Sequence, residues 1–155
     1  MNTKKVMVLV ASCFAGLLGA NPVFAASTII GGASCHHLEA QKVGDIEYYQ
    51  HGLTNASKVS SSSVICPIEK KAYDYKGVKV RINLDSKGPN TVACTLYSRN
   101  PNGTPISSKT VKNIGSGKEA LLVSVASSTP RSYFSLICNL PGNEVSEIFS
   151  VETLN

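Results

Sequence analysis

The strongest constraint on the fold is a two-residue alternation of apolar and polar side chains in the second half of the chain. Apolar residues recur at every second position in residues 78–84, 92–97, 121–125 and 134–140, and a last strand is expected near 148–153. Side chains of a β-strand point to opposite faces in turn, so this period is typical of strands with one buried face. Turn residues rather than helical stretches separate these runs.

The sequence therefore predicts an all-β fold, an antiparallel β-sandwich of jelly-roll or immunoglobulin-like type. One domain fits the 155 residues, of which 43% are hydrophobic, enough for a packed core. Collagen and coiled-coil structures are excluded, because glycine has no three-residue period and only 16% of the residues are charged.

The first 25 residues predict an export signal. Lys4 and Lys5 precede an apolar run over residues 6–18, and small residues flank the position of cleavage at Ala25. We therefore expect a mature domain of residues 26–155 that is secreted to the periplasm or the medium. Removal of the signal lowers the net charge from +5 to +3, which is too weak a positive charge to indicate nucleic acid as a partner.

Three alternatives to this cleavage remain open. Cleavage after Ala26 satisfies the same rule, and the residues before Cys13 loosely resemble a lipoprotein box, which would make Cys13 a lipid-bearing terminus. The apolar run is short for a membrane anchor, which needs about 20 residues. Beyond Ala26 the sequence contains no apolar stretch long enough to span a bilayer, so no transmembrane segment is expected in the mature chain.

An even number of cysteines in an exported chain indicates disulfides, and four lie beyond residue 26. They are Cys35, Cys66, Cys94 and Cys138. Their separations of 31, 28 and 44 residues lack the close pairs of a zinc site, so neither a metal nor a cofactor is expected. Of three possible connectivities we favour Cys94–Cys138 with Cys35–Cys66, because Cys94 and Cys138 both lie on the apolar face of a predicted strand.

The segment Asn100-Pro101-Asn102-Gly103 predicts a hairpin turn, since proline fixes φ and glycine accepts a left-handed conformation. Pairing of Asn100 with Thr104 would place Leu96 opposite Ser108. The returning strand is polar on both faces along most of its length, so we expect it at a sheet edge.

Two blocks carry a resemblance to known proteins. They are the Cys-Thr-Leu-Tyr-Ser-Arg run at residues 94–99 and the Leu-x-Cys-x-Leu-Pro run that ends at Pro141. Together they resemble a group of short exported bacterial proteins of unassigned function, over about residues 91–151. The resemblance implies a bacterial source, export and disulfide bonds, and it brings no catalytic motif.

One candidate binding patch interleaves basic and aromatic residues, a pattern that suits an anionic partner. It consists of Lys70, Lys71, Tyr73, Tyr75 and Lys76. A solvent-exposed loop with lysines for solubility is the alternative interpretation of the same residues.

A second patch would form on an outward strand face if the strand over residues 78–84 pairs with the strand over residues 92–97. Tyr97 and Arg99 would then lie beside Lys79 and Arg81. A plain solvent-exposed face is again the alternative.

These patches predict a non-enzymatic module that binds an anionic glycan, a lipid head group or an acidic protein. A secreted hydrolase with a cryptic serine–histidine site at His37 or His51 is an alternative, although no nucleophile-elbow motif is present. An inhibitor that inserts the turn at residues 100–104 into a hydrolase is another. A metal site of His37 and His51 with nearby acidic residues is also conceivable.

Overall fold

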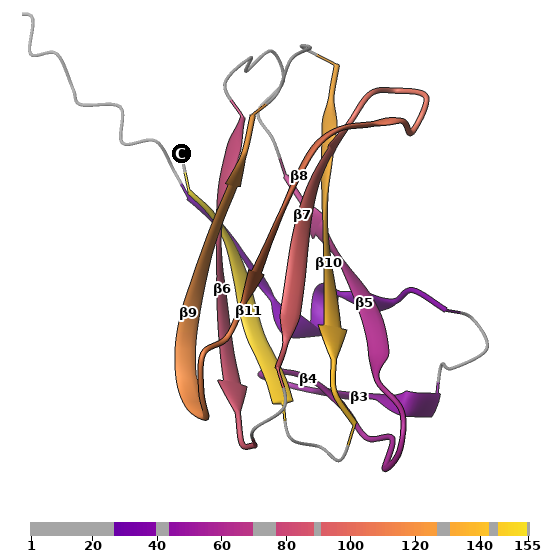
Figure 1. The fold of residues 1–155 in the computed structure, drawn as a ribbon, viewed down its shortest axis with the longest axis vertical. Coiled ribbons are helices and arrows are strands. Elements are labelled where there is room, and N and C mark those ends of the chain that lie inside the picture. The colour runs from indigo at the N-terminus through magenta and orange to yellow at the C-terminus, as the bar shows by residue number, and fades with distance from the viewer. Residues whose placement is uncertain are drawn as a thin grey trace, which may run out of the picture.

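The computed structural model describes residues 27–39, 44–69, 77–88, 91–126, 131–142 and 146–154. The predicted export signal, Cys13 and the patch at residues 70–76 lie outside the described residues, so these remain predictions. Two antiparallel sheets face each other as the layers of a sandwich (Figure 1).

The first layer, sheet A, has the strand order β3-β4-β11-β6-β9, and β1 also pairs with β11. Its strands are β1 (Thr28–Gly31), β3 (Ile46–Tyr49), β4 (Gly52–Asn55), β6 (Val78–Ser86), β9 (Gly117–Val125) and β11 (Ser146–Leu154). β4 pairs with the start of β11 and β1 with its end, and the register of β11 against β6 shifts between Ile148 and Ser150. β11 is therefore the central strand of the layer.

The second layer, sheet B, has the order β2-β5-β10-β7-β8. Its strands are β2 (His36–His37), β5 (Ser62–Ile68), β7 (Ala93–Arg99), β8 (Pro105–Lys112) and β10 (Tyr133–Leu140). A short 3-10 helix, η1 (Gly32–Ser34), leads from β1 in sheet A to β2 in sheet B. An ideal Cβ on Gly32 would lie 2.0 Å from the carbonyl oxygen of Ile148, so this crossing passes too close to β11 for any side chain.

The connections follow the jelly-roll pattern. From β4 to β11 consecutive strands alternate between the two sheets, with the β7–β8 hairpin as the exception. The layers β4-β11-β6-β9 and β5-β10-β7-β8 are the two four-stranded halves of such a fold. The predicted single-domain β-sandwich is confirmed, in its jelly-roll rather than its immunoglobulin-like form. Within the part of the chain that the structure describes, no helix has the length and apolar character needed to cross a membrane.

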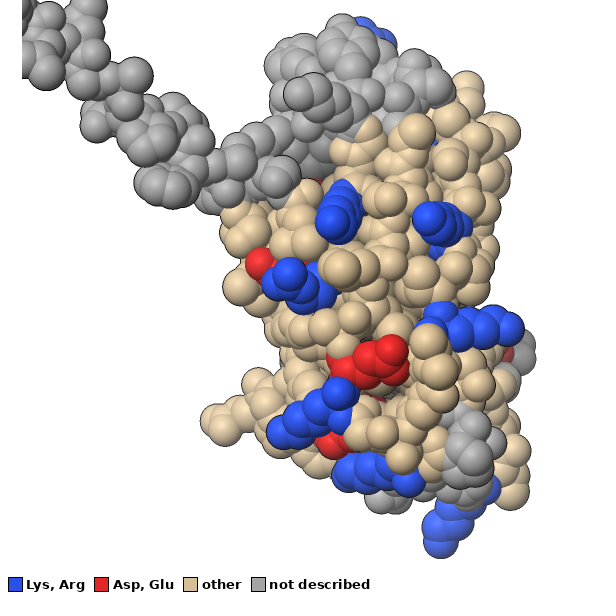
Figure 2. Space-filling model, turned by 60° about the vertical axis from the view of Figure 1, so that its left-hand side comes forward, with Lys and Arg blue, Asp and Glu red and all other residues tan. Residues whose placement is uncertain are grey.

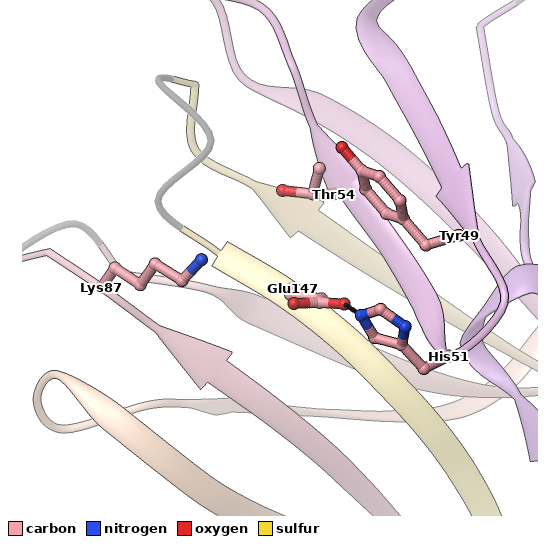
Figure 3. A pocket seen from close by; sticks show the side chains of 5 residues that line it. All are labelled: Tyr49, His51, Thr54, Lys87 and Glu147. Atoms are coloured by element: carbon pink, nitrogen blue, oxygen red, sulfur yellow. Dashed lines mark ion pairs between the residues drawn. The ribbon is translucent and has the colours of Figure 1, made fainter.

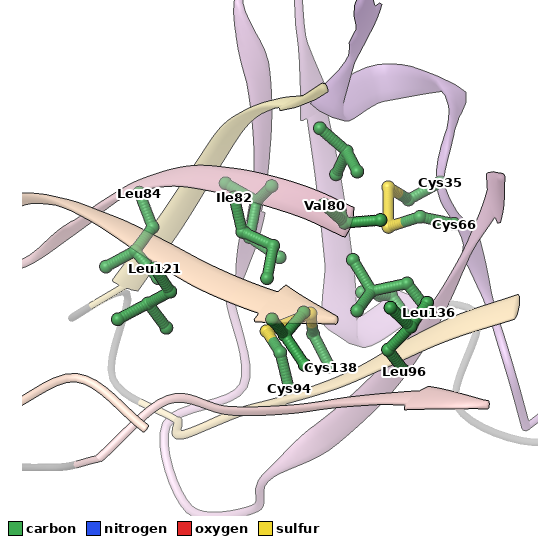
Figure 4. Close-up of a cluster of buried hydrophobic side chains, with 14 of the residues drawn as sticks. Cys35, Cys66, Val80, Ile82, Leu84, Cys94, Leu96, Leu121, Leu136 and Cys138 are labelled. Carbon is green, nitrogen blue, oxygen red and sulfur yellow. A yellow bond between two sulfur atoms is a disulfide. The ribbon is translucent and has the colours of Figure 1, made fainter. Parts of the chain in front are cut away.

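The core lies between the sheets and is built from the alternating residues that the sequence singled out. Val80, Ile82 and Leu84 of β6 are at most 1% exposed, and Leu96 and Leu136 of sheet B are fully buried (Figure 4). Burying one such side chain contributes about 1.5–3 kcal/mol of hydrophobic free energy. The two-residue period therefore reports which face of each strand is packed.

Both predicted disulfides are present and fully buried: Cys35–Cys66 and Cys94–Cys138. Cys94 and Cys138 are direct cross-strand neighbours in β7 and β10. Cys35 directly precedes β2, where His36 lies opposite Ile65, so the Cys35–Cys66 bond also joins neighbouring strands. Both disulfides thus brace sheet B internally, and neither links the two layers (Figure 4).

The hairpin at residues 100–104 forms, and its returning strand β8 is the predicted edge strand. The register beyond the turn differs from our expectation. The Asn100 N–H donates to the Thr104 carbonyl at 3.0 Å, but an irregularity between Ser98 and Arg99 places Leu96 opposite Lys109 instead of Ser108. One extra residue in β8 causes the shift, as is usual for a β-bulge.

Candidate functional site

The structure separates the residues of the second predicted patch. β6 belongs to sheet A and β7 to sheet B, so the two strands do not pair. Lys79 and Arg81 therefore do not lie beside Tyr97 and Arg99, and the expectation of one joint surface was wrong. The alternation in each strand was recognised correctly, but alternation does not reveal which strand is the neighbour.

Tyr97 and Arg99 instead join a third residue, Tyr133, on the outer face of sheet B. We call these three residues the arginine cluster. The Arg99 guanidinium carbon lies 4.8 Å from the centroid of the Tyr97 ring, and Nη1 of Arg99 donates to the Gly103 carbonyl at 2.9 Å. Tyr133 is the cross-strand neighbour of Arg99 and is 45% exposed. Ring and carbonyl together hold the guanidinium in one place.

The turn next to the cluster needs its glycine. Gly103 has φ +85°, a conformation that side-chain-bearing residues rarely adopt. An ideal Cβ at this position would lie 3.6 Å from the Tyr133 hydroxyl, so the turn reaches over to Tyr133. The turn motif that the sequence singled out therefore helps to position the arginine cluster.

An apolar groove of about 320 Å³ borders the arginine cluster. Its lining comes from β2, β5 and β10: His36, Ile65, Cys66, Pro67, Tyr133, Phe134 and Ser135. Tyr133 belongs to both features, and Ser135 lies opposite Pro67 on one side and Tyr97 on the other. The groove and the cluster are consequently one continuous stretch of the outer face of sheet B.

The charge of this face is one-sided. Arg99 and Lys112 lie on this face, and no strand of sheet B contains an aspartate or glutamate. Lys109 lies opposite the core-facing Leu96 and therefore on the inner side of the sheet. Within the described ranges, Arg99 forms no ion pair with a carboxylate. The guanidinium thus keeps donors available for an anion.

A second cavity, of about 230 Å³, lies against sheet A, and we call it the polar pocket (Figure 3). The β3–β4 hairpin, the start of β11 and the residue after β6 contribute its lining: Tyr49, His51, Thr54, Lys87 and Glu147. Nε2 of His51 lies 3.0 Å from Oε1 of Glu147, and the rings of Tyr49 and His51 stack with centroids 5.9 Å apart. This pocket could not be predicted from the sequence, because 96 residues separate His51 from Glu147 and no motif links them.

The histidine-based alternatives find no support in the described residues. No group of three or more histidine, cysteine, aspartate or glutamate residues there is arranged to hold a metal ion. His37 accepts a hydrogen bond from the Glu39 N–H at 3.1 Å, and His51 faces Glu147. No serine hydroxyl in the described ranges hydrogen-bonds to either of these two histidines.

No protein-family model and no curated protein matches this sequence. Solved structures do share its fold. The C-terminal CBM6 domain of LamC, a marine laminarinase from Zobellia galactanivorans, matches with a TM-score of 0.53 at 12% identity, over 84% of this chain and 100% of that one. The CBM36-1 domain of a multidomain xylanase from the hindgut metagenome of Trinervitermes trinervoides matches with a TM-score of 0.50 at 12% identity, over 84% of this chain and 98% of that one. At these identities the likeness establishes the sandwich fold alone.

Proposed function

We propose that this protein is an exported, non-catalytic module that binds an anionic glycan on the outer face of sheet B. The observation that carries the proposal is Arg99, a guanidinium held over the Tyr97 ring and without an acidic partner among the described residues. The resemblance to short exported bacterial proteins and the predicted export signal agree with this proposal.

The arginine cluster offers the two contacts that an acidic sugar needs. A guanidinium presents its N–H groups in a planar fork that matches a carboxylate or sulfate, and Arg99 uses one of them for Gly103. The exposed Tyr133 ring and the apolar groove offer area for the apolar face of a sugar ring. No strand of sheet B contributes a carboxylate that would repel the anion.

The shared fold supports the same class of ligand. The two matched domains are designated as carbohydrate-binding modules, and they stand within a laminarinase and a xylanase. Their cores are organised as two facing sheets like this chain, which leaves the outer sheet faces and loops for recognition. By analogy of fold alone, these domains support a non-catalytic role for this chain.

We expect the disulfide-bonded protein to bind immobilised polygalacturonate or dextran sulfate and not unsulfated dextran. Arg99→Gln and Tyr133→Ala should each weaken binding at least tenfold, a loss of about 1.4 kcal/mol. Affinity electrophoresis measures this, and salt should release the protein because exposed charges are screened within about 8 Å at 0.15 M.

Tyr48→Ala is the matched control, since Tyr48 lies on β3 of sheet A and is 46% exposed against 45% for Tyr133. Equal binding by wild type and Arg99→Gln would refute the proposal. If only the triple reversal of Lys70, Lys71 and Lys76 to Glu abolishes binding, the site belongs to that segment instead. Binding to anionic vesicles without binding to either polymer would assign a lipid ligand and reject a glycan.

A further inference from the structure

We propose that the polar pocket is a second binding site, which takes one neutral, hydroxyl-rich ring such as a hexose or pentose unit. Its volume of about 230 Å³ lies below the roughly 300–1,000 Å³ of sites for drug-sized ligands, so it suits a single ring. The site is independent of the proposed function, because it lies on sheet A and shares no residue with the arginine cluster.

The pocket is preorganised around Glu147. This residue lies between Thr54 of β4 and Asp85 of β6 in the sheet, and its side chain is only 15% exposed. Gly52 lets the β3–β4 hairpin approach, because an ideal Cβ there would lie 2.3 Å from the Ile148 carbonyl oxygen and 3.2 Å from Oε1 of Glu147. The Gly52 backbone therefore lies directly against the Glu147 side chain, with no room for a side chain of its own.

Two aromatic rings lie beside the histidine that faces this carboxylate. The His51 ring stacks on Tyr49 and lies 6.2 Å from the centroid of the Phe149 ring on β11. Figure 3 shows Tyr49 and His51 on one side of the pocket and Lys87 on the other, with Glu147 between them. The walls therefore come from parts of the chain that are far apart in sequence.

The hydrogen-bonding groups of the pocket favour a ligand that mainly donates. The Thr54 hydroxyl donates its proton to the Ser146 carbonyl at 2.7 Å, and the Tyr49 hydroxyl donates to Glu47, so each hydroxyl can only accept from a ligand. The Glu147 carboxylate is also an acceptor. A row of sugar hydroxyls, each able to donate and to accept, matches this set.

The charges of the pocket favour a neutral ligand. Lys87 faces the same cavity as Glu147 but does not pair with it, and within the described residues Lys87 has no ion-pair partner. An anion would meet the Glu147 carboxylate, and a cation would meet Lys87. Adjacent hydroxyls can instead donate to Glu147 and accept from Lys87 at once, without an unpaired charge on the ligand.

Nuclear magnetic resonance titration of the nitrogen-15-labelled, disulfide-bonded protein tests this site. The probes are D-glucose, D-galactose, D-mannose and D-xylose at millimolar concentrations, with D-glucuronate as the anionic comparison. We expect saturable shifts at the backbone amides of His51, Thr54 and Glu147 for at least one neutral sugar and none there for glucuronate. Glu147→Gln and Lys87→Ala should each raise the dissociation constant at least tenfold.

Glu152→Gln is the matched control for Glu147→Gln. Glu152 also lies on β11, its side chain is 14% exposed, and it forms an ion pair with Arg81 at 2.9 Å. This variant should bind the sugar like wild type, and so should Arg99→Gln, which alters only the site on sheet B. The proposal is overturned if none of the four sugars shifts the pocket amides, or if binding survives Lys87→Ala, an exposed substitution that leaves the fold intact.

Discussion

The two sheets of this sandwich differ in how they use charge and covalent bonds. Both disulfides join segments of sheet B, and none of its strands contains an acidic residue. The strands of sheet A have no disulfide and contain five acidic residues: Glu47, Asp85, Glu119, Glu147 and Glu152. Acidic and basic side chains lie interspersed on the side of the molecule that carries β9 (Figure 2). The strands of sheet A thus carry five acidic and three basic residues (Lys79, Arg81 and Lys118), with Arg81 and Glu152 in an ion pair, whereas those of sheet B carry basic residues only.

The comparison shows that the two layers are held by interactions of unequal strength. Disulfides that close long loops contribute a few kcal/mol, whereas partly exposed ion pairs contribute 0–1 kcal/mol. Sheet B, braced by cystines, can leave an unpaired guanidinium on its outer face. Sheet A relies on packing and on hydrogen bonds that reach across to sheet B.

The largest effect should come from removing a cystine. Replacement of Cys94 and Cys138 by alanine opens a link across 44 residues and should cost about 4 kcal/mol of unfolding free energy on the loop-entropy model. The Cys35 and Cys66 pair, 31 residues apart, should cost nearly as much. Urea denaturation measures both costs. A loss of unfolding free energy below about 1 kcal/mol would contradict the claim that the disulfides make sheet B the more strongly held layer.

An intermediate effect is expected where sheet A is tied to sheet B by a buried amide. Asn55 of β4 is fully buried, and its Nδ2 donates to the carbonyls of Ser60 and Leu140 at 2.9 Å each, while its Oδ1 accepts from the Ser57 N–H. Asn55→Ala leaves these groups unpaired and should destabilise the protein by about 2–3 kcal/mol.

Asn139→Ala is the control for this variant, because Asn139 lies exposed on β10 and its loss should change stability by less than about 0.5 kcal/mol. Equal unfolding free energies for the two alanine variants would mean that the layers are joined by apolar packing alone.

The smallest effect should follow from breaking an ion pair of sheet A. In Glu152→Gln the pair with Arg81 is lost, yet the Arg81 side chain is 41% exposed, so the expected cost is under about 1 kcal/mol. Denaturation at low and high salt should show this difference shrinking as salt rises. A cost near that of a cystine would reverse our ranking of the two sheets.

Much of the fold was within reach of the sequence. The alternation in residues 78–84 and 134–140 reports burial directly, and it placed Cys94 and Cys138 on core-facing positions whose pairing the structure confirms. Neighbour relations were out of reach, because strands that follow each other along the chain, such as β6 and β7, lie in different sheets. Strand pairing is decided by long-range packing, which a local pattern does not encode.

The candidate sites were harder to predict for the same reason. Tyr97 and Arg99 were recognised, but Tyr133 was not, since only the pairing of β7 with β10 brings it to Arg99. The polar pocket depends on the close approach of Gly52 to β11, and no sequence pattern around His51 predicts this approach. The predicted register of β8 was wrong because a single bulge shifts every later pair by one residue.

The pairing of β1 with β11 has a consequence for how the module is presented. Thr28 lies directly opposite Thr153, so the first and last described strands begin and end side by side at one end of the sandwich (Figure 1). Glu147 lies at the other end of β11, seven residues from Leu154, or about 23 Å along an extended strand. Tethering to a cell surface or a fusion partner through either end would therefore point the Glu147 end outward, away from the support.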